Sequence, residues 1–111
     1  MRTLDTRVFL VTRHHGAQDW LRLRLRGLQP ILKTHLDDLD EIRPGDMVCG
    51  VLPLSLAATL CRHGVVVICI DVDVPEALRG QELDACTLDR LGARLTRYEV
   101  SACPWTEGNQ A

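Results

Sequence analysis

Residues 8–20 read VFLVTRHHGAQDW, and this stretch decides the fold of the chain. An apolar, β-rich run is followed at once by Thr-Arg-His-His-Gly, and an amphipathic helical pattern begins directly after it. A strand that passes through a glycine turn into a helix places unpaired backbone N–H groups at the helix N-terminus, where anions are favoured. The sequence therefore predicts a strand–helix unit whose turn binds anions and carries one guanidinium and two imidazoles, from Arg13, His14 and His15.

The rest of the chain continues this alternation of strands and helices. We expect strands at residues 7–12, 30–35, 47–51, 65–71 and 93–100, and helices at residues 17–26, 54–63 and 85–91. The run at 65–70 is apolar at each position, which is typical of a strand buried on both faces of a parallel sheet. The pattern predicts a single α/β domain over residues 1–100, with an open, mostly parallel, Rossmann-like sheet and helices on both faces. A loosely ordered tail follows at residues 101–111.

Residues 20–26 are compatible with two structures. Their apolar and arginine residues alternate strictly, as in a half-buried strand, but most of the apolar side chains from 17 to 28 also fall on one stripe of a helix. We expect the helix, with Trp20 in the core, Leu23 outside the apolar stripe and Gly27 as the C-terminal cap. A strand in this place would rule out the doubly wound fold.

Composition argues against several functional classes. A formal net charge of −2 does not suit a dedicated binder of long nucleic acid, which needs a broad basic face. The sequence has neither an apolar window of about 18 residues nor the apolar core of a secretory signal, so we expect no membrane partner and a cytoplasmic protein. The five cysteines show no C-x-x-C spacing and are expected to be small buried hydrophobes. Adjacent histidines are a poor start for a metal site, so we expect neither metal nor cofactor.

Ligands of open parallel sheets bind beyond the carboxyl ends of the strands. That rule gathers four loops on one edge, at residues 12–16, 35–38, 52–55 and 71–80. The polar or conformationally special residues of these loops are the candidates for substrate binding beside the turn at 13–15. They are Thr12, Gly16, His35, Pro53, Ser55 and Arg79.

The opening stretch resembles the V-T-R-H-x-G-A-x-x-W signature of a small, Csx-type family encoded in type III CRISPR loci. Further segments fit in order, at residues 35–37 (HLD), 43–46 (RPGD), 51–58 (VLPL with AA) and 73–83 (DVP with RGQEL). The resemblance implies a Rossmann-like (CARF-like) fold and a homodimer. It also implies a ring nuclease, an enzyme that opens cyclic oligoadenylate second messengers such as cyclic tetra-adenylate and switches off type III CRISPR signalling.

The residues are compatible with metal-independent ring opening. The substrate's own 2′-hydroxyl must attack the phosphorus in line, the phosphoryl charge must be stabilised, and the leaving 5′-oxygen must be protonated. Arg13 is suited to hold the phosphate, and a histidine is suited to supply the proton, with His14 and His15 both open as the donor. Two alternatives remain: a non-catalytic sensor or sponge for the same ligand, and an interaction subunit with a vestigial pocket.

Overall fold

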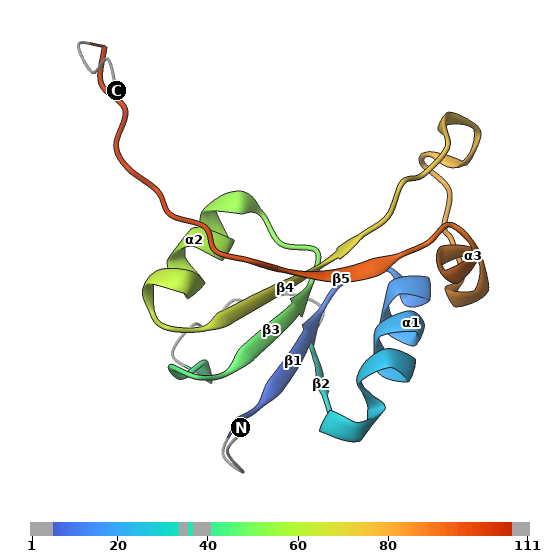
Figure 1. Ribbon diagram of the computed structural model, residues 1–111, viewed down its shortest axis with the longest axis horizontal. Coiled ribbons are helices and arrows are strands. Elements are labelled where there is room, and N and C mark those ends of the chain that lie inside the picture. Colours follow the sequence, from blue (N-terminus) through green and yellow to red (C-terminus); the bar gives the residue numbers. More distant parts are fainter. Residues whose placement is uncertain (1–5, 34–35, 37–40, 108–111) are drawn as a thin grey trace.

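One five-stranded sheet organises the chain in the computed structural model, which describes residues 6–33, 36 and 41–107 (Figure 1). Its strands are β1 Val8–Val11, β2 Ile31–Lys33, β3 Met47–Gly50, β4 Val66–Asp71 and β5 Arg94–Tyr98. Its helices are α1 His15–Leu25, α2 Leu54–Arg62 and α3 Ala85–Arg90, with 3₁₀ turns η1 Arg26–Leu28 and η3 Glu76–Leu78.

The sheet is open and mostly parallel, as the sequence predicted. Its strand order is β2-β1-β3-β4-β5. The first four strands run parallel, and β5 pairs antiparallel with β4 at the edge. The chain therefore starts in the interior of the sheet, places β2 on one side of β1, and then returns to place β3 on the other side. The order of the strands reverses between β1 and β3, which is the position where doubly wound sheets bind ligands.

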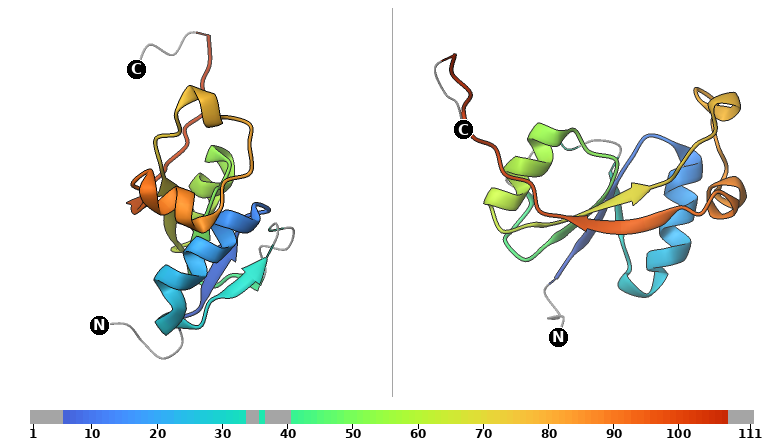
Figure 2. Two further views of the ribbon diagram at one scale, coloured as in Figure 1. Left: turned by 90° about the vertical axis from the view of Figure 1, so that its right-hand side faces the viewer. Right: turned by 45° about the horizontal axis from the view of Figure 1, so that its top comes forward.

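Helices cover both faces of the sheet because β1 is apolar on both sides. Val8 and Leu10 join the core beneath α1 and α3, whereas Phe9 and Val11 join the core beneath α2. Successive side chains of a strand point to opposite faces, so four consecutive buried residues supply two cores at once. Figure 2 shows α1 and α3 together on one side of the sheet and α2 on the other.

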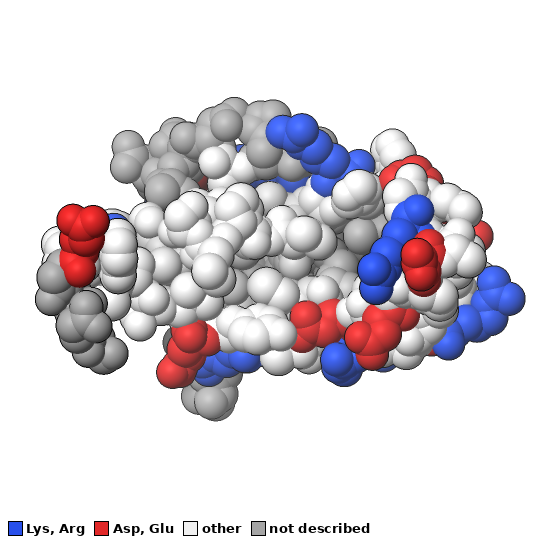
Figure 3. All heavy atoms as spheres, turned by 90° about the horizontal axis from the view of Figure 1, so that it is seen from above, with Lys and Arg blue, Asp and Glu red and all other residues white. Residues whose placement is uncertain are grey.

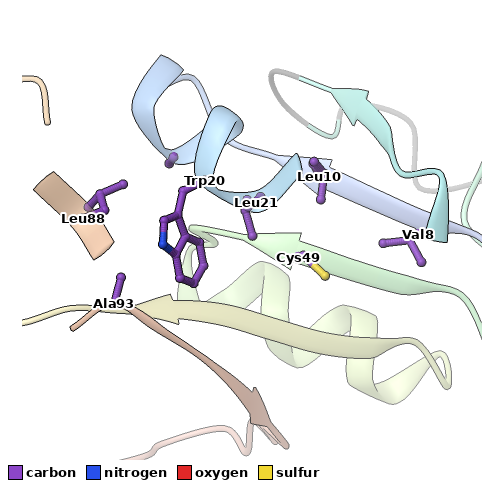
Figure 4. Close-up of a cluster of buried hydrophobic side chains, with 8 residues drawn as sticks. Val8, Leu10, Trp20, Leu21, Cys49, Leu88 and Ala93 are labelled. Carbon is purple, nitrogen blue, oxygen red and sulfur yellow. The ribbon is translucent and has the colours of Figure 1, made fainter. Parts of the chain in front are cut away.

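Residues 20–25 lie in helix α1, so the expected helix is confirmed and the alternative strand is excluded there. Trp20 is buried in the first core, between the sheet and α3, whereas Leu23 is 62% exposed (Figure 4). The predicted role of Gly27 was wrong: this glycine lies within η1, and the left-handed residue that ends the turn is Gln29, with φ of 51°. Helix α1 also begins at His15, two residues earlier than expected, because the chain turns at Thr12 and not at Gly16.

The other boundaries lie close to the predicted ones. The strand expected at 30–35 is described over Ile31–Lys33, and residues 34–35 lie outside the described part of the chain. Residues 101–107 are exposed and run away from the sheet, outside any helix or strand (Figure 1). None of the described helices has the length and apolar character needed to cross a membrane.

The cysteines are only in part the small buried hydrophobes that we expected. Cys49 is fully buried, and burial raises the pKa of its thiol to about 12, so this side chain is inert at neutral pH. Cys61 and Cys69 are half-buried. For Cys86 and Cys103 the expectation was wrong, because the structure places both on the surface.

A buried carboxylate ties β1 to β3 at the amino ends of these strands. Asp46 accepts hydrogen bonds from Nη2 of Arg7 at 2.8 Å, from the backbone N–H of Arg43 at 2.9 Å and from that of Arg7 at 3.3 Å. Burial raises the pKa of this carboxyl, but the hydrogen bonds outweigh burial and hold the pKa below its usual value. Sequence reasoning missed this ion pair, whose partners lie 39 residues apart.

Candidate active site

Two loops meet where the strand order reverses. The chain leaves β1 through residues 12–14 into α1, and it leaves β3 through residues 51–53 into α2. The backbone N–H of Val51 donates to the carbonyl of Val11 at 3.2 Å, so the two loops are joined directly. Gly50 permits this contact, since its φ is 151° and a Cβ there would lie 2.0 Å from the Val11 carbonyl oxygen. Both helix N-termini therefore begin at the same edge of the sheet.

A hollow of ≈ 370 Å³ lies between these loops, and we call it the switch hollow. Four of the residues that line it were candidates from the sequence: Thr12, Arg13, His14 and Pro53. Its other lining residues are apolar: Val11, Leu36, Val51, Leu52 and Leu56. Figure 3 views the molecule from the side toward which β1 runs, where uncharged side chains occupy the middle of the face and charged groups lie around it. The switch hollow combines a guanidinium and an imidazole with an apolar wall.

Thr12 fixes the turn that carries these two groups. Its side chain is buried, and its Oγ1 accepts a hydrogen bond from the backbone N–H of His14 at 3.2 Å. Its carbonyl oxygen accepts a second bond, at 2.9 Å, from Nε2 of Gln18, which is buried one turn into α1. The turn is thus held from both sides, while Arg13 and His14 remain exposed at its surface. Gln18 was not predicted, because its burial and its bond to Thr12 are visible only in the structure.

His14 pairs with an acidic residue from a distant part of the chain. Its Nδ1 lies 2.9 Å from Oε2 of Glu82, which belongs to the loop between η3 and α3. Both side chains are about two-thirds exposed, at 66% and 65%. A carboxylate at Nδ1 restrains the orientation of the ring, and Nε2 is not part of this contact.

Gly16 has a packing role that explains how Glu82 reaches His14. A Cβ at Gly16 would lie 1.7 Å from the carbonyl oxygen of Leu83, so only glycine lets this segment approach the first turn of α1. The close approach of Leu83 carries its neighbour Glu82 to the edge of the site. The sequence candidate Gly16 is therefore buried beneath the site and shapes it through the backbone.

The remaining candidate residues lie at the margin of the site or outside the part of the chain that the structure describes. His15 is the exposed first residue of α1 and does not line the switch hollow. Ser55 is exposed in α2, where its carbonyl accepts a bond from Oγ1 of Thr59 at 3.1 Å. Arg79 is exposed after η3, and its Nε donates to the carbonyl of Val74 at 3.2 Å. His35 lies outside the described residues.

A second hollow, of ≈ 230 Å³, adjoins the first, and we call it the apolar hollow. His14 and Val51 line both hollows and stand between them. The other lining residues come from α1, the end of β4, the loop after it and α3: Ala17, Ile70, Val72, Val74, Gln81, Glu82, Leu83 and Leu88. Among residues 6–33, 36 and 41–107, no group of three His, Cys, Asp or Glu side chains could hold a metal ion.

Residues 9–101 match a protein family described as "Putative CRISPR-associated protein (Cas_VVA1548)". The chain belongs to this CRISPR-associated family. The matched segment begins within β1, ends after β5 and includes the lining residues of both hollows. A search of curated proteins and a search of solved structures found no match. Membership of the family establishes the association with CRISPR but no catalytic activity.

Proposed function

We propose that this CRISPR-associated protein is a metal-independent ring nuclease. It binds cyclic oligoadenylate, with cyclic tetra-adenylate as the expected ring, and opens it to a linear product that ends in a 2′,3′-cyclic phosphate. The observation that carries the proposal is the joint presence of Arg13 and His14 in one hollow at the strand-order reversal. The sequence resemblance to the V-T-R-H-x-G-A-x-x-W family supports the choice of substrate.

Phosphate binding follows from the charge at this edge. The N-termini of α1 and α2 both begin beside the switch hollow, and their backbone N–H groups favour an anion. Arg13 adds a guanidinium that makes charge-assisted hydrogen bonds with phosphate oxygens. These interactions act on the bound phosphodiester and grow stronger as negative charge develops on its oxygens during attack.

His14 is the proposed proton donor. The ribose 2′-oxygen forms a bond to phosphorus, the bond from phosphorus to the 5′-oxygen breaks, and Nε2 of His14 protonates the departing oxygen. The 2′-hydroxyl proton passes to solvent, so no water is consumed in the step. Glu82 is a positioning residue, because its carboxylate contacts Nδ1 and so orients the ring with Nε2 toward the departing oxygen.

Two copies of the chain are expected to act together. A ring of four phosphates has two-fold symmetry, which a symmetric dimer matches by presenting Arg13 twice. Val51 and Leu54 are 59% and 75% exposed beside the switch hollow, so an interface there brings two hollows together. Leu23, which the sequence offers as a candidate interface residue because it lies outside the apolar stripe, is also exposed, but it lines neither hollow.

The dimer is tested by light scattering on matched variants. Leu54→Asp should give a monomer, whereas Leu23→Asp should remain dimeric. A strict monomer in the unaltered protein, with and without the ring, would remove the dimer from the account.

Incubation of the protein with cyclic tetra-adenylate in excess chelator, followed by chromatography, tests the function itself. We expect the ring to disappear with time, and His63→Ala, an exposed change at the far end of α2, to behave as the unaltered protein. A ring that stays intact but binds in calorimetry would indicate a sponge or sensor. A ring that neither binds nor opens would indicate that the protein is an interaction subunit.

A further inference from the structure

We propose that the apolar hollow is a subsite for an adenine base of the ligand, a proposal that rests on the proposed function. The position of the apolar hollow supports this role. The apolar hollow shares His14 and Val51 with the switch hollow, so a nucleotide whose phosphate contacts Arg13 can extend its base past His14. Base and phosphate of one nucleotide then occupy adjoining hollows.

The lining of the apolar hollow suits the faces of a purine. Val51, Val72 and Val74 offer aliphatic surface, and Ala17 adds a small side chain from α1. Val51 is 59% exposed, so its side chain is accessible to a ligand from both hollows. Sites for small molecules are mostly apolar with few polar groups, and the polar groups decide which molecule is accepted.

Two polar side chains at the rim suit the hydrogen-bonding edge of adenine. Adenine offers an amino group as donor and ring nitrogens as acceptors. Gln81 donates through Nε2 to the carbonyl of Ala77 at 3.2 Å, which uses one of two amide N–H groups and leaves the amide able to offer the other with its oxygen. Glu82 is a carboxylate with two oxygens, of which Oε2 contacts His14. The amide of Gln81 can pair with either an amino group or a carbonyl, whereas the carboxylate of Glu82 attracts an amino group and repels a carbonyl at the same position of the base.

The test compares the binding of 5′-AMP with that of 5′-IMP. The base of 5′-AMP carries an amino group at the position where the base of 5′-IMP carries a carbonyl. Binding is followed by the methyl NMR signals of Val72, Val74 and Leu88, so the measurement does not depend on cleavage. We expect 5′-AMP to shift these signals and to bind about 5- to 10-fold more tightly than 5′-IMP, the low end of what a paired amide contact discriminates.

Two variants sharpen the test. Val74→Phe fills the hollow from the loop after β4 and should weaken 5′-AMP binding by at least about tenfold, since steric exclusion removes the contacts of the base. Ala77→Phe adds the same bulk at an exposed position of η3 that does not line the hollow, and it should bind 5′-AMP as the unaltered protein does.

Equal affinity for 5′-AMP and 5′-IMP, or methyl signal changes confined to Thr12 and Leu56 in the switch hollow, would overturn the subsite. Full ring opening by Val74→Phe would likewise overturn it and leave the proposed nuclease standing. Conversely, discrimination of 5′-AMP in a protein that opens no ring would uphold the subsite and contradict the nuclease.

Discussion

The two ends of the central strands each carry a hydrogen-bonded pair of polar side chains, and the two pairs are built in opposite ways. At the amino ends, Asp46 is 3% exposed and holds Arg7 within a set of three hydrogen bonds. At the carboxyl ends, His14 and Glu82 are about two-thirds exposed beside two hollows, with a single contact between them. The first pair is enclosed by the fold, and the second is open to a ligand.

The amino ends of β1 and β3 are rigid, whereas the groups suited to chemistry lie exposed at their carboxyl ends. A buried carboxylate with several donors cannot rearrange without leaving a desolvated charge, so Asp46 fixes the start of β1 against β3. An exposed pair contributes little to folding free energy, and the His14 ring stays accessible to a bound phosphate. Substitutions at the two ends should therefore separate cleanly into effects on stability and effects on turnover.

The largest expected effect is on catalysis at the carboxyl end. His14→Ala should lower the single-turnover rate of ring opening by about 10²–10⁴, the usual contribution of a general acid, with little change in affinity. His15→Ala is the matched control, because His15 is the neighbouring exposed histidine and does not line the switch hollow. An equal loss in both variants would contradict the assignment of the donor to His14.

Arg13→Ala should weaken both binding and turnover. The guanidinium contacts phosphate before and during attack, so its removal should cost about 1.5–3 kcal/mol in kcat/KM, the range of hydrogen bonds to charged groups. Arg22→Ala, an exposed change on α1, should leave both quantities unaltered. Calorimetry with the intact ring and a rate measurement separate the two effects, and unaltered affinity in Arg13→Ala would exclude a phosphate contact.

At the amino end, Asp46→Asn should lower the free energy of unfolding by ~1–2 kcal/mol, because an amide has one acceptor oxygen where the carboxylate has two. Ring opening per folded molecule should not change. Asp73→Asn, at an exposed carboxylate on the loop after β4, should stay within about 0.5 kcal/mol of the unaltered protein. Urea unfolding followed by circular dichroism measures both, and equal stability of the two variants would refute the structural role of Asp46.

A smaller effect concerns the pH dependence of stability. The folded-state pKa of Asp46 lies below its usual value, so its contribution is present above the unfolded pKa and is lost as the pH falls below about 4. The same direction holds for Asp71, Asp84 and Asp89, where hydrogen bonds, led by those from Thr96, Thr87 and Arg24 respectively, lower the pKa. The difference in unfolding midpoint between Asp46→Asn and the unaltered protein should therefore be smaller at pH 3 than at pH 7, and an equal difference at both pH values would count against this linkage.

The sequence was informative wherever neighbouring residues determine the outcome. The four apolar residues of β1 and the continuous run at 65–70 predicted a parallel sheet covered on both faces, and the structure has one. Trp20 could be placed in the core from its helical stripe alone. Contacts between distant segments could not be predicted in this way. The partners of the His14–Glu82 pair lie 68 residues apart, and only the path of the loop after β4 decides that they meet.

The sequence was also misleading where a turn was expected at a glycine but is formed by another residue. Gly16 and Gly27 indicated a turn and a helix cap from the sequence. In the structure Thr12 makes the turn through its hydroxyl, Gly16 is a contact for Leu83, and Gln29 takes the left-handed conformation. The start of α1 therefore lay two residues earlier than expected, which places His15 on the helix and leaves His14 at the edge of the hollow.

The most direct test of the account is the ³¹P NMR spectrum of cyclic tetra-adenylate after incubation with the unaltered protein in excess chelator. We expect the ring to be consumed and the resonance of a terminal 2′,3′-cyclic phosphate to appear, because the attacking oxygen belongs to the substrate. An unchanged spectrum would contradict the nuclease. Consumption that stops in chelator and returns with Mg²⁺ or Mn²⁺ would contradict the metal-independent mechanism and direct attention to Asp71 and Asp73.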